Sequence, residues 1–295
     1  MPDIVIAGLG EVLWDVLPDS EEIGGAPVNF AYHVNALGGR GLPVSTVGDD
    51  ERGRRALAEL AARGLDVSAI SMDPGRPTGY VAANVDESGV AHYVFPDDVA
   101  WDNLTFSPET LARAKTLDGV CFGSLAQRSP ASREAVVRFL AALPEKALKV
   151  FDVNLRQTFY SRDIIADSLK RADIFKISDE ELPILRSMFD LSGDDASVLH
   201  ALLRRHCLRL CVLTRGSKGG LLVSLDAISD HPGVTAEVAD TIGAGDAFTA
   251  AVALGHLLGH TLDAINERAN RLAAYVCSRS GAMPPIPEAY KLIRG

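Results

Sequence analysis

A chain of 295 residues is long enough for one large α/β domain or two small ones. Its composition, 47% hydrophobic and 23% charged, is that of an ordinary globular protein. The net charge of −10 argues against the broad positive surface that binds nucleic acid or an anionic membrane, although it allows a local basic pocket for an anionic ligand.

The sequence shows no signal for a membrane span or for secretion. No apolar run approaches the ~18 residues of a membrane helix, and the apolar N-terminus lacks a basic start and a cleavage site. Four scattered cysteines without a CxxC pair favour a reducing cytoplasm. Cys207 and Cys211 could share a helix face, but two thiols alone are a poor metal site, so we expect ordinary buried cysteines.

Short apolar segments alternate with amphipathic ones along most of the chain. Strands are predicted at residues 3–10, 42–48, 118–124, 149–154, 173–178 and 208–216. Helices are predicted at residues 28–39, 51–64, 132–143, 162–172, 179–189, 197–207 and 249–259. This alternation predicts an α/β protein whose mostly parallel sheet is covered by helices on both faces. Because no repeat or linker interrupts it, we expect one domain over residues 1–295.

Residues 78–95 break this pattern because they alternate with period two around a turn at Asp86–Gly89. A β-hairpin without a crossover helix must lie outside the main sheet, as a lid, an interface element or a decoration. An exposed hairpin edge can pair with its twin in a second copy, so we expect a homodimer through this element.

The stretch DTIGAGDAF, residues 240–248, places flexible backbone and an acid at the start of a buried helix. The first amides of a helix lack internal partners, and glycines let an anion approach them closely. Asp246 would repel that anion unless it accepts a proton from a hydroxyl that attacks it. The alternative is a capping Asp beside a packing Gly-Ala-Gly.

A second stretch, GGAPVNFAYHVNALGG at residues 24–39, resembles a rim that binds a polyol through backbone amides and the side chain of Asn29. Asp15 follows the first strand, at the edge where open α/β sheets bind ligands. A carboxylate there accepts hydrogen bonds from hydroxyls, although a solvated loop acid is the alternative.

Together the two stretches resemble the N-terminal and C-terminal signatures of the PfkB-type, or ribokinase-like, carbohydrate kinases, in the right order and over essentially the whole chain. The resemblance implies a three-layer α/β sandwich with a small β lid formed by about residues 12–23 and 77–103. It also implies phosphorylation of a sugar by ATP with Mg²⁺. A non-catalytic sugar- or nucleotide-binding protein on the same fold is the alternative from a different class.

By motif position, the resemblance assigns a role to each of several residues. Asp246 is the implied catalytic base, and the amides of Gly243, Ala244 and Gly245 form the anion hole. The implied sugar-binding residues are Asp15, Gly25 and Asn29. The implied nucleotide-binding residues are Thr214, Gly216 and Gly219 in VLTRGSKGG, and Asn270 and Ala273 near the adenine, with Gly281 and Ala282 in the adjoining loop.

The segment DVNLR, residues 152–156, also follows a predicted strand and resembles substrate- and phosphate-facing residues of the family's sugar kinases. Asn154 is therefore expected at the sugar. Arg156 is expected to hold phosphate charge or a substrate oxygen, because its planar fork suits both. Its alternative is pairing with a surface acid.

One segment departs from the family pattern. FKISDEEL has Ser178 where the family usually has Asn, and keeps Glu181, which implies an Mg²⁺ role through bound water. Asp240 and the backbone of Ile242 resemble a monovalent-cation loop of part of the family, which leaves the use of K⁺ open.

The motifs GEVLWDVLP, GGAPVNFA, GSLAQRS and DVNLR most resemble the fructokinase branch. A 2-keto-3-deoxygluconate kinase is the nearest rival, since Arg156 could hold a carboxylate, followed by a ribokinase-type enzyme. A sugar-phosphate substrate is not expected, although Arg128 could serve one. A P-loop NTPase is excluded by the missing GxxxxGK[ST], and a dehydrogenase is disfavoured because Leu13 replaces the third glycine of GxGxxG.

Overall fold

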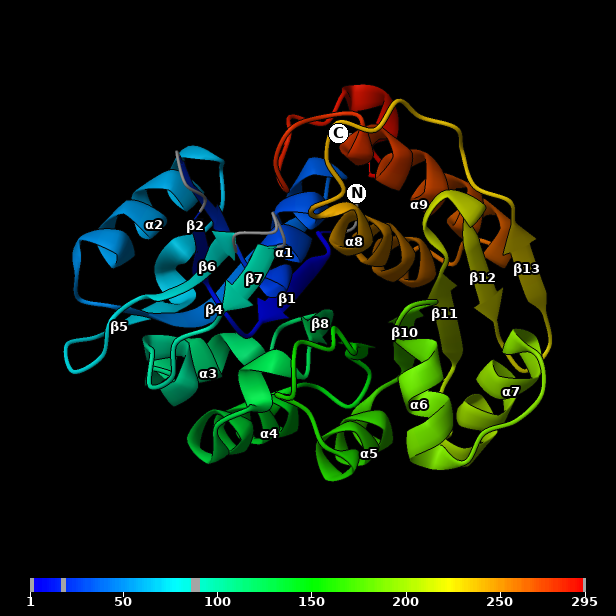
Figure 1. Cartoon of the computed structure of the whole chain (residues 1–295), viewed down its shortest axis with the longest axis horizontal. Helices are drawn as coiled ribbons and strands as arrows, with labels where there is room; N and C mark the ends of the chain where they lie inside the picture. The colour runs from blue at the N-terminus through cyan, green and yellow to red at the C-terminus, as the bar shows by residue number, and fades with distance from the viewer. Residues whose placement is uncertain (1–2, 17–19, 86–90, 294–295) are drawn as a thin grey trace.

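The computed structural model describes residues 3–16, 20–85 and 91–293, and a nine-stranded sheet runs through its centre (Figure 1). From edge to edge the strands are β13 (Ile228–His231), β12 (Gly220–Val223), β11 (Leu210–Thr214), β10 (Ile174–Ser178), β9 (Leu148–Asp152), β8 (Gly119–Phe122), β1 (Val5–Leu9), β4 (Arg40–Gly48) and β5 (Ile70–Asp73). The pairs β11–β12 and β12–β13 are antiparallel, and all the others are parallel. The predicted mostly parallel sheet is therefore confirmed.

Helices cover both faces of this sheet (Figure 1). One face carries α1 (Ala26–Ala36), α8 (Ala244–Leu257) and α9 (Leu262–Cys277), and the other carries α3 (Pro108–Ala114), α4 (Pro130–Ala142), α5 (Arg162–Arg171), α6 (Leu182–Phe189) and α7 (Asp195–His206). Each face buries its own apolar core against the sheet. The predicted three-layer architecture is confirmed. None of the helices in the described ranges is long and apolar enough to cross a membrane.

A second, four-stranded sheet has the order β3 (Glu21–Gly24), β2 (Leu13–Val16), β6 (Gly79–Val85) and β7 (Ala91–Val94). The hairpin β6–β7 thus lies outside the main sheet, as predicted, while its expected turn at Asp86–Gly89 lies outside the described residues. Helix α2 (Glu51–Ala62) packs Ala56 and Leu60 in one apolar cluster with the fully buried Trp14 of β2. This cluster fixes the small sheet beside strand β4.

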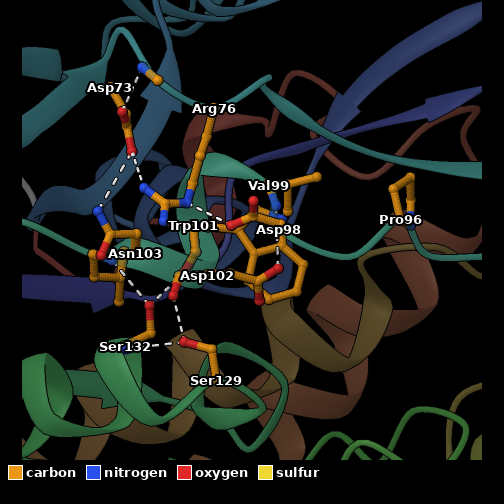
Figure 2. Close-up of polar contacts among 12 residues, drawn as sticks. Asp73, Arg76, Pro96, Asp98, Val99, Trp101, Asp102, Asn103, Ser129 and Ser132 are labelled. Atoms are coloured by element: carbon orange, nitrogen blue, oxygen red, sulfur yellow. Dashed lines mark hydrogen bonds and ion pairs between the residues drawn. The ribbon is translucent and has the colours of Figure 1, made fainter.

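Polar contacts hold together the segments that lead into and out of the hairpin (Figure 2). Arg76, before β6, forms ion pairs with Asp73 at 3.3 Å and with Asp98, after β7, at 2.6 Å. The hydroxyl of Ser132 in α4 donates to the backbone carbonyl of Trp101 at 2.7 Å. The segments that flank the hairpin are therefore tied to each other by Arg76 and to helix α4 of the main domain by Ser132.

Two sequence expectations need correction. Helix α6 begins at Leu182 rather than at residue 179, because residues 179–181 form a turn in which the side chain of Glu181 bonds to backbone. Cys207 ends α7 in a left-handed conformation (φ 56°) and is exposed, whereas Cys211 is buried in β11. The two thiols therefore share no helix face, and only Cys211 fits the expectation of a buried cysteine.

Candidate active site

Helices α1 and α8 begin differently from most of the other helices. The helices α2, α3, α4, α5, α7 and α9 are each capped by an Asp, Ser or Thr side chain that accepts from a first-turn amide. Within the described chain, α1 and α8 have no such cap and start at Gly25 and Gly243. The amides at the start of α8 are therefore open to a ligand, at the positive end of that helix dipole. In α1, by contrast, Pro27 has no N–H, the amides of Val28 and Asn29 bond to the carbonyl of Gly25 at 3.0 Å, and the amide of Ala26 faces the Glu11 carboxylate.

The two glycines are sterically required at these helix starts. Gly243 has φ 77°, and a Cβ on it would lie 2.5 Å from the carbonyl oxygen of Ala282. Gly25 has φ 118°, and a Cβ on it would lie 2.4 Å from the carbonyl oxygen of Glu11. Any side chain at either position would push the neighbouring backbone away, so the close approach of these loops depends on glycine.

Three predicted anion-hole residues lie at the start of α8. The amide of Ala244 makes a long bond of 3.4 Å to the carbonyl of Thr241. In the described ranges, the amides of Gly243 and Gly245 have no backbone acceptor. These two amides are the better donors for an incoming anion.

Asp246 lies in the first turn of α8, beside these amides. Its Oδ2 accepts a hydrogen bond of 2.9 Å from Nδ2 of Asn29 in α1, which is itself buried. Although part of its surface is exposed, loss of water and then the nearby charge of Asp152 raise the pKa of Asp246 to about 6. Asn29, Lys176 and Arg156 oppose this rise. A carboxylate in this range is suited to accept a proton near neutral pH.

A buried polar network lies behind the start of α8. Nζ of Lys176 in β10 is 3.0 Å from Oδ1 of Asp152 at the end of β9. The hydroxyl of Thr249 in α8 donates to Oδ2 of the same carboxylate at 3.0 Å. A Cβ on Gly245 would lie 3.4 Å from the Lys176 ammonium, so this positive charge sits directly behind the predicted anion hole.

Glu11, just after β1, is a second buried carboxyl at this site, with 2% of its surface exposed. Burial raises its pKa to about 7, while the amides of Glu11 and Ala26 and the charge of Arg156 favour its ionised form. A cavity of about 10 Å³ touches Glu11 and Asp246, together with Asp152 and Asn154. Four polar side chains therefore meet around one small space.

The predicted sugar-binding Asp15 lies in β2 of the small sheet, opposite Glu22. Its Oδ2 lies over Gly24, where an added Cβ would be 2.8 Å away. Burial and then the charge of Glu22 raise the pKa of Asp15 to about 6, and Arg156 opposes the rise. The Asp15 carboxylate of the small sheet therefore interacts electrostatically with Arg156 of the main domain.

Asn154 and Arg156 follow β9. Asn154 adopts φ 43° and lines the small cavity, and Arg156 is exposed, with Nη1 bonded to the carbonyl of Leu155 at 3.0 Å. The charge of Arg156 lowers the pKa of three carboxyls: Glu11, Asp15 and Asp246. Among the described residues no acid forms a salt bridge with Arg156, so the alternative of a surface pair is not supported there, and the charge of Arg156 acts on the same cluster as the predicted base.

Ser178 and Glu181 bond reciprocally. Oε2 of Glu181 accepts from the amide of Ser178 at 2.9 Å, and the Ser178 hydroxyl accepts from the amide of Glu181 at 3.3 Å. Oε1 of Glu181 also accepts from the amide of Leu155 at 2.7 Å. The pattern is that of a capping box. Ser178 therefore fixes the glutamate in place, and each carboxylate oxygen keeps a lone pair for a metal-bound water.

Asp240 ties together the loops on the C-terminal side of the site. Its two oxygens accept from the amides of Ile242 and Gly281, each at 3.0 Å. In the described ranges, no three His, Cys, Asp or Glu side chains gather in a way that would hold a metal ion. The two hydrogen bonds of Asp240 shape the loop that precedes Gly243.

The predicted nucleotide-binding residues lie around β11, β12 and α9. Thr214 ends β11, Gly216 has φ 54°, and a Cβ on Gly219 would lie 2.0 Å from the carbonyl of His231. Helix α9 is joined to the start of β12 by the side chain of Asn266, which also accepts from Nδ2 of Asn270 at 2.8 Å. Ala273 is partly buried in the same helix. The side-chain NH₂ group of Asn270 therefore bonds within its own helix.

Arg128 does not serve as a free phosphate-binding residue. Its side chain is 5% exposed and forms an ion pair of 2.6 Å with the buried Asp102. The guanidinium lies 4.1 Å from the centre of the Trp101 ring and 4.7 Å from that of Phe159. Arg128 is therefore part of the fold, and the possibility that it serves a sugar phosphate is not supported.

Comparison with known proteins decides the family. The model of the pfkB family carbohydrate kinases matches residues 14–289. The chain belongs to the pfkB family of carbohydrate kinases. It is 30% identical over 296 residues to a fructokinase of Klebsiella pneumoniae, with 95% of each chain covered. It is also 30% identical to an uncharacterized sugar kinase of Pyrococcus horikoshii, whose crystal structure with ATP gives a TM-score of 0.78 over 95% of this chain and 93% of that one.

The pfkB kinase shares its fold with more distant members. The crystal structure of a fructokinase of Xylella fastidiosa with bound ATP is 22% identical, with a TM-score of 0.83 over 97% of this chain and 96% of that one. The predicted ribokinase-like fold and the predicted enzyme class, an ATP-dependent carbohydrate kinase, are confirmed. The non-catalytic alternative is therefore set aside.

Sequence reasoning missed three residues of the kinase's site: Glu11, Asp152 and Lys176. Glu11 lies just after β1 and Asp152 ends β9, which is the edge of the main sheet where the sequence also placed Asp15. The structure corrects that placement, because Asp15 lies within β2 of the small sheet. Lys176 stands alone in an apolar strand, and a buried lysine requires a charged partner nearby. These signals could have marked all three.

Proposed function

We propose that this kinase transfers the γ-phosphoryl group of ATP to a hydroxyl of fructose. The observation that carries the proposal is the position of Asp246. A carboxylate held by Asn29 lies in the first turn of an uncapped helix, beside amides that can receive an anion. That arrangement suits a base that accepts the proton of an attacking hydroxyl while the helix start balances charge on the transferred phosphoryl group.

The remaining residues of the proposed site divide between the sugar and the phosphates. Asp15, Gly25, Asn29 and Asn154 hold the sugar hydroxyls, and Arg156 stabilises negative charge between the two substrates. Thr214, Gly216, Gly219, Asn270 and Ala273 line the nucleotide. Glu181, whose orientation is fixed by two backbone amides, would hold Mg²⁺ through water, and the ion would supply positive charge to balance the phosphates. The loop of Asp240 and Ile242 is the candidate position for K⁺.

The small sheet serves as a lid in this proposal. It carries Asp15 and Glu22, and a Cβ on Gly281 of the opposite loop would lie 3.3 Å from the Glu22 carboxylate. The sheet therefore reaches across the sugar position, where it can exclude water from the phosphoryl group. The edge strands β3 and β7 also supply the surface for the proposed homodimer.

Fructose is proposed because two fructokinases with nearly complete coverage, of Klebsiella pneumoniae and Zea mays, are among the relatives. ADP release with ATP and Mg²⁺ tests this against fructose, ribose, 2-keto-3-deoxygluconate, adenosine and fructose 6-phosphate. Turnover with fructose at the highest kcat/KM supports the proposal. A preference for the sugar acid would instead assign Arg156 to its carboxylate, and the fructose assignment would be wrong.

A further inference from the structure

Three carboxyl groups meet at the small cavity beside α8, and their partners differ. Asp246 receives Nδ2 of Asn29, and Asp152 receives both Lys176 and Thr249. Oε2 of Glu11, in contrast, is buried and has no hydrogen-bond partner among the residues that the structure describes. The side chain is 2% exposed, so bulk water does not solvate this oxygen either.

A buried carboxyl oxygen without a donor is unfavourable, and such groups in native structures normally have a protein, water or ligand partner. The cavity that touches Glu11 has a volume of about 10 Å³, which is the space of a single water-sized group. A sugar hydroxyl has that size and carries a proton to donate. Asp246 and Asn154 line the same space.

The surroundings of Glu11 point to the sugar rather than to the nucleotide. Its backbone carbonyl lies against Gly25, and the amide of Ala26 stabilises its carboxylate. Both neighbours belong to the start of α1, next to Asn29. A hydroxyl in the cavity would therefore sit between the rim of α1 and Asp246.

We propose that Glu11 is a substrate-binding residue, whose Oε2 accepts a hydrogen bond from the sugar hydroxyl next to the one that faces Asp246. The proposal rests on the proposed sugar-kinase function and specifies one contact of that site. Either protonation state of the carboxyl offers an acceptor oxygen, so the contact persists on both sides of its pKa of about 7. A sugar without this hydroxyl would leave Oε2 unpaired, so the site selects against that one deoxy sugar.

A double-mutant cycle between protein and ligand tests the contact. Calorimetry without nucleotide gives the dissociation constants of fructose and its monodeoxy analogues for three proteins: the wild type, Glu11→Ala and Glu145→Gln. The last is the control, because the Glu145 side chain is exposed in the turn between α4 and β9. We expect wild type to bind one analogue about tenfold or more weakly than fructose. Glu11→Ala should bind fructose about tenfold more weakly and lose its discrimination against that analogue, while Glu145→Gln behaves as wild type.

Equal fructose affinity of wild type and Glu11→Ala would overturn the proposal, as would full discrimination retained in the variant. If Glu11→Ala melts below the assay temperature, Glu11→Met serves instead, because it keeps most of the volume and has no acceptor oxygen. It should weaken fructose binding in the same direction, and an unchanged constant would be decisive against the contact. Binding with the expected coupling but without ADP release would refute only the proposed function. Turnover by Glu11→Ala with unchanged KM would refute only the role of Glu11. Absence of sugar binding by wild type would refute both.

Discussion

The side-chain amide of Asn29 donates to Oδ2 of Asp246 at 2.9 Å, across 217 positions of the chain. This bond joins the start of α1, where the sugar rim lies, to the start of α8, where the anion hole lies. It uses one oxygen of the carboxylate and leaves Oδ1 to accept a proton. The relative position of base, sugar and phosphate therefore depends on the contact between these two helices.

The pH dependence of kcat/KM should show an acid limb near pH 6. Burial raises the pKa of Asp246 to about 6, so the base is ionised above that pH and becomes protonated as the pH falls through it. Activity should then drop about tenfold per pH unit below pH 6. An acid limb near pH 4, the range of an ordinary aspartate, would contradict this assignment. Because Glu11 and Asp15 also titrate in this region, the limb reports the whole cluster.

Replacing Asn29 should identify the contribution of Asp246 to that limb. The Asn29 bond favours the charged form of Asp246, so Asn29→Ala should raise the pKa and move the acid limb up by about half to one pH unit. Asn35→Ala is the matched control on the same helix, since Asn35 bonds to Gly64 and Gly41 instead. Overlapping profiles for wild type and Asn29→Ala would show that the bond does not tune the base.

Gly243→Ala should lose activity because of a steric clash and not only because of its positive φ. The added Cβ would lie 2.5 Å from the carbonyl of Ala282, which displaces the anion-hole backbone. We expect kcat to fall by about 10²-fold or more. Gly64→Ala is the control, because Gly64 also has positive φ (82°) but no atom within 4 Å of its Cβ position. It should cost about 1 kcal/mol of stability and leave kcat unchanged; equal kcat values for the two variants would contradict the clash.

Two aspartates near the base of the small sheet should differ in their effect on stability (Figure 2). Asp102 is 8% exposed and pairs with the buried Arg128, so Asp102→Asn should lower the free energy of unfolding by about 3–5 kcal/mol. Asp98 is 78% exposed and pairs with Arg76, so Asp98→Asn should cost at most about 1 kcal/mol. Urea unfolding measures both. Similar losses of unfolding free energy in the two variants would show that the contribution of an ion pair here does not depend on its burial.

The main sheet and its helices could be predicted from the sequence because their signals are local. Strand β9 is a short apolar run, and α5 combines an apolar stripe with a Ser161 side chain that caps its first turn. The pairing of β2 with β6 is not local, since about 65 residues separate Leu13 from its partner Gly79 and nothing in either strand specifies the other. The local pattern showed only the hairpin, and its grouping with residues 12–23 came from the family resemblance.

The site was partly predictable for the same reason. Asp246 and Asn29 lie in motifs with distinctive spacing, but the bond between them appears only when α1 packs against α8. The Lys176–Asp152 pair joins two neighbouring strands, and the sequence of neither strand indicates that its charged residue has a partner in the other. The departure from the family pattern at Ser178 gave no indication of how Glu181 is held. In the structure the Ser178 hydroxyl accepts from the backbone amide of Glu181, and the amides of Ser178 and Leu155 orient its carboxylate.

The most direct test of the account is the turnover of wild type and Asp246→Asn, side by side, with fructose, ATP and Mg²⁺. Loss of the base should cut kcat by about 10²- to 10⁴-fold, while the thermal unfolding transition and the calorimetric affinity for fructose stay close to those of wild type. Near-normal ADP release by Asp246→Asn would contradict the central claim, because the proton of the attacking hydroxyl would then go elsewhere.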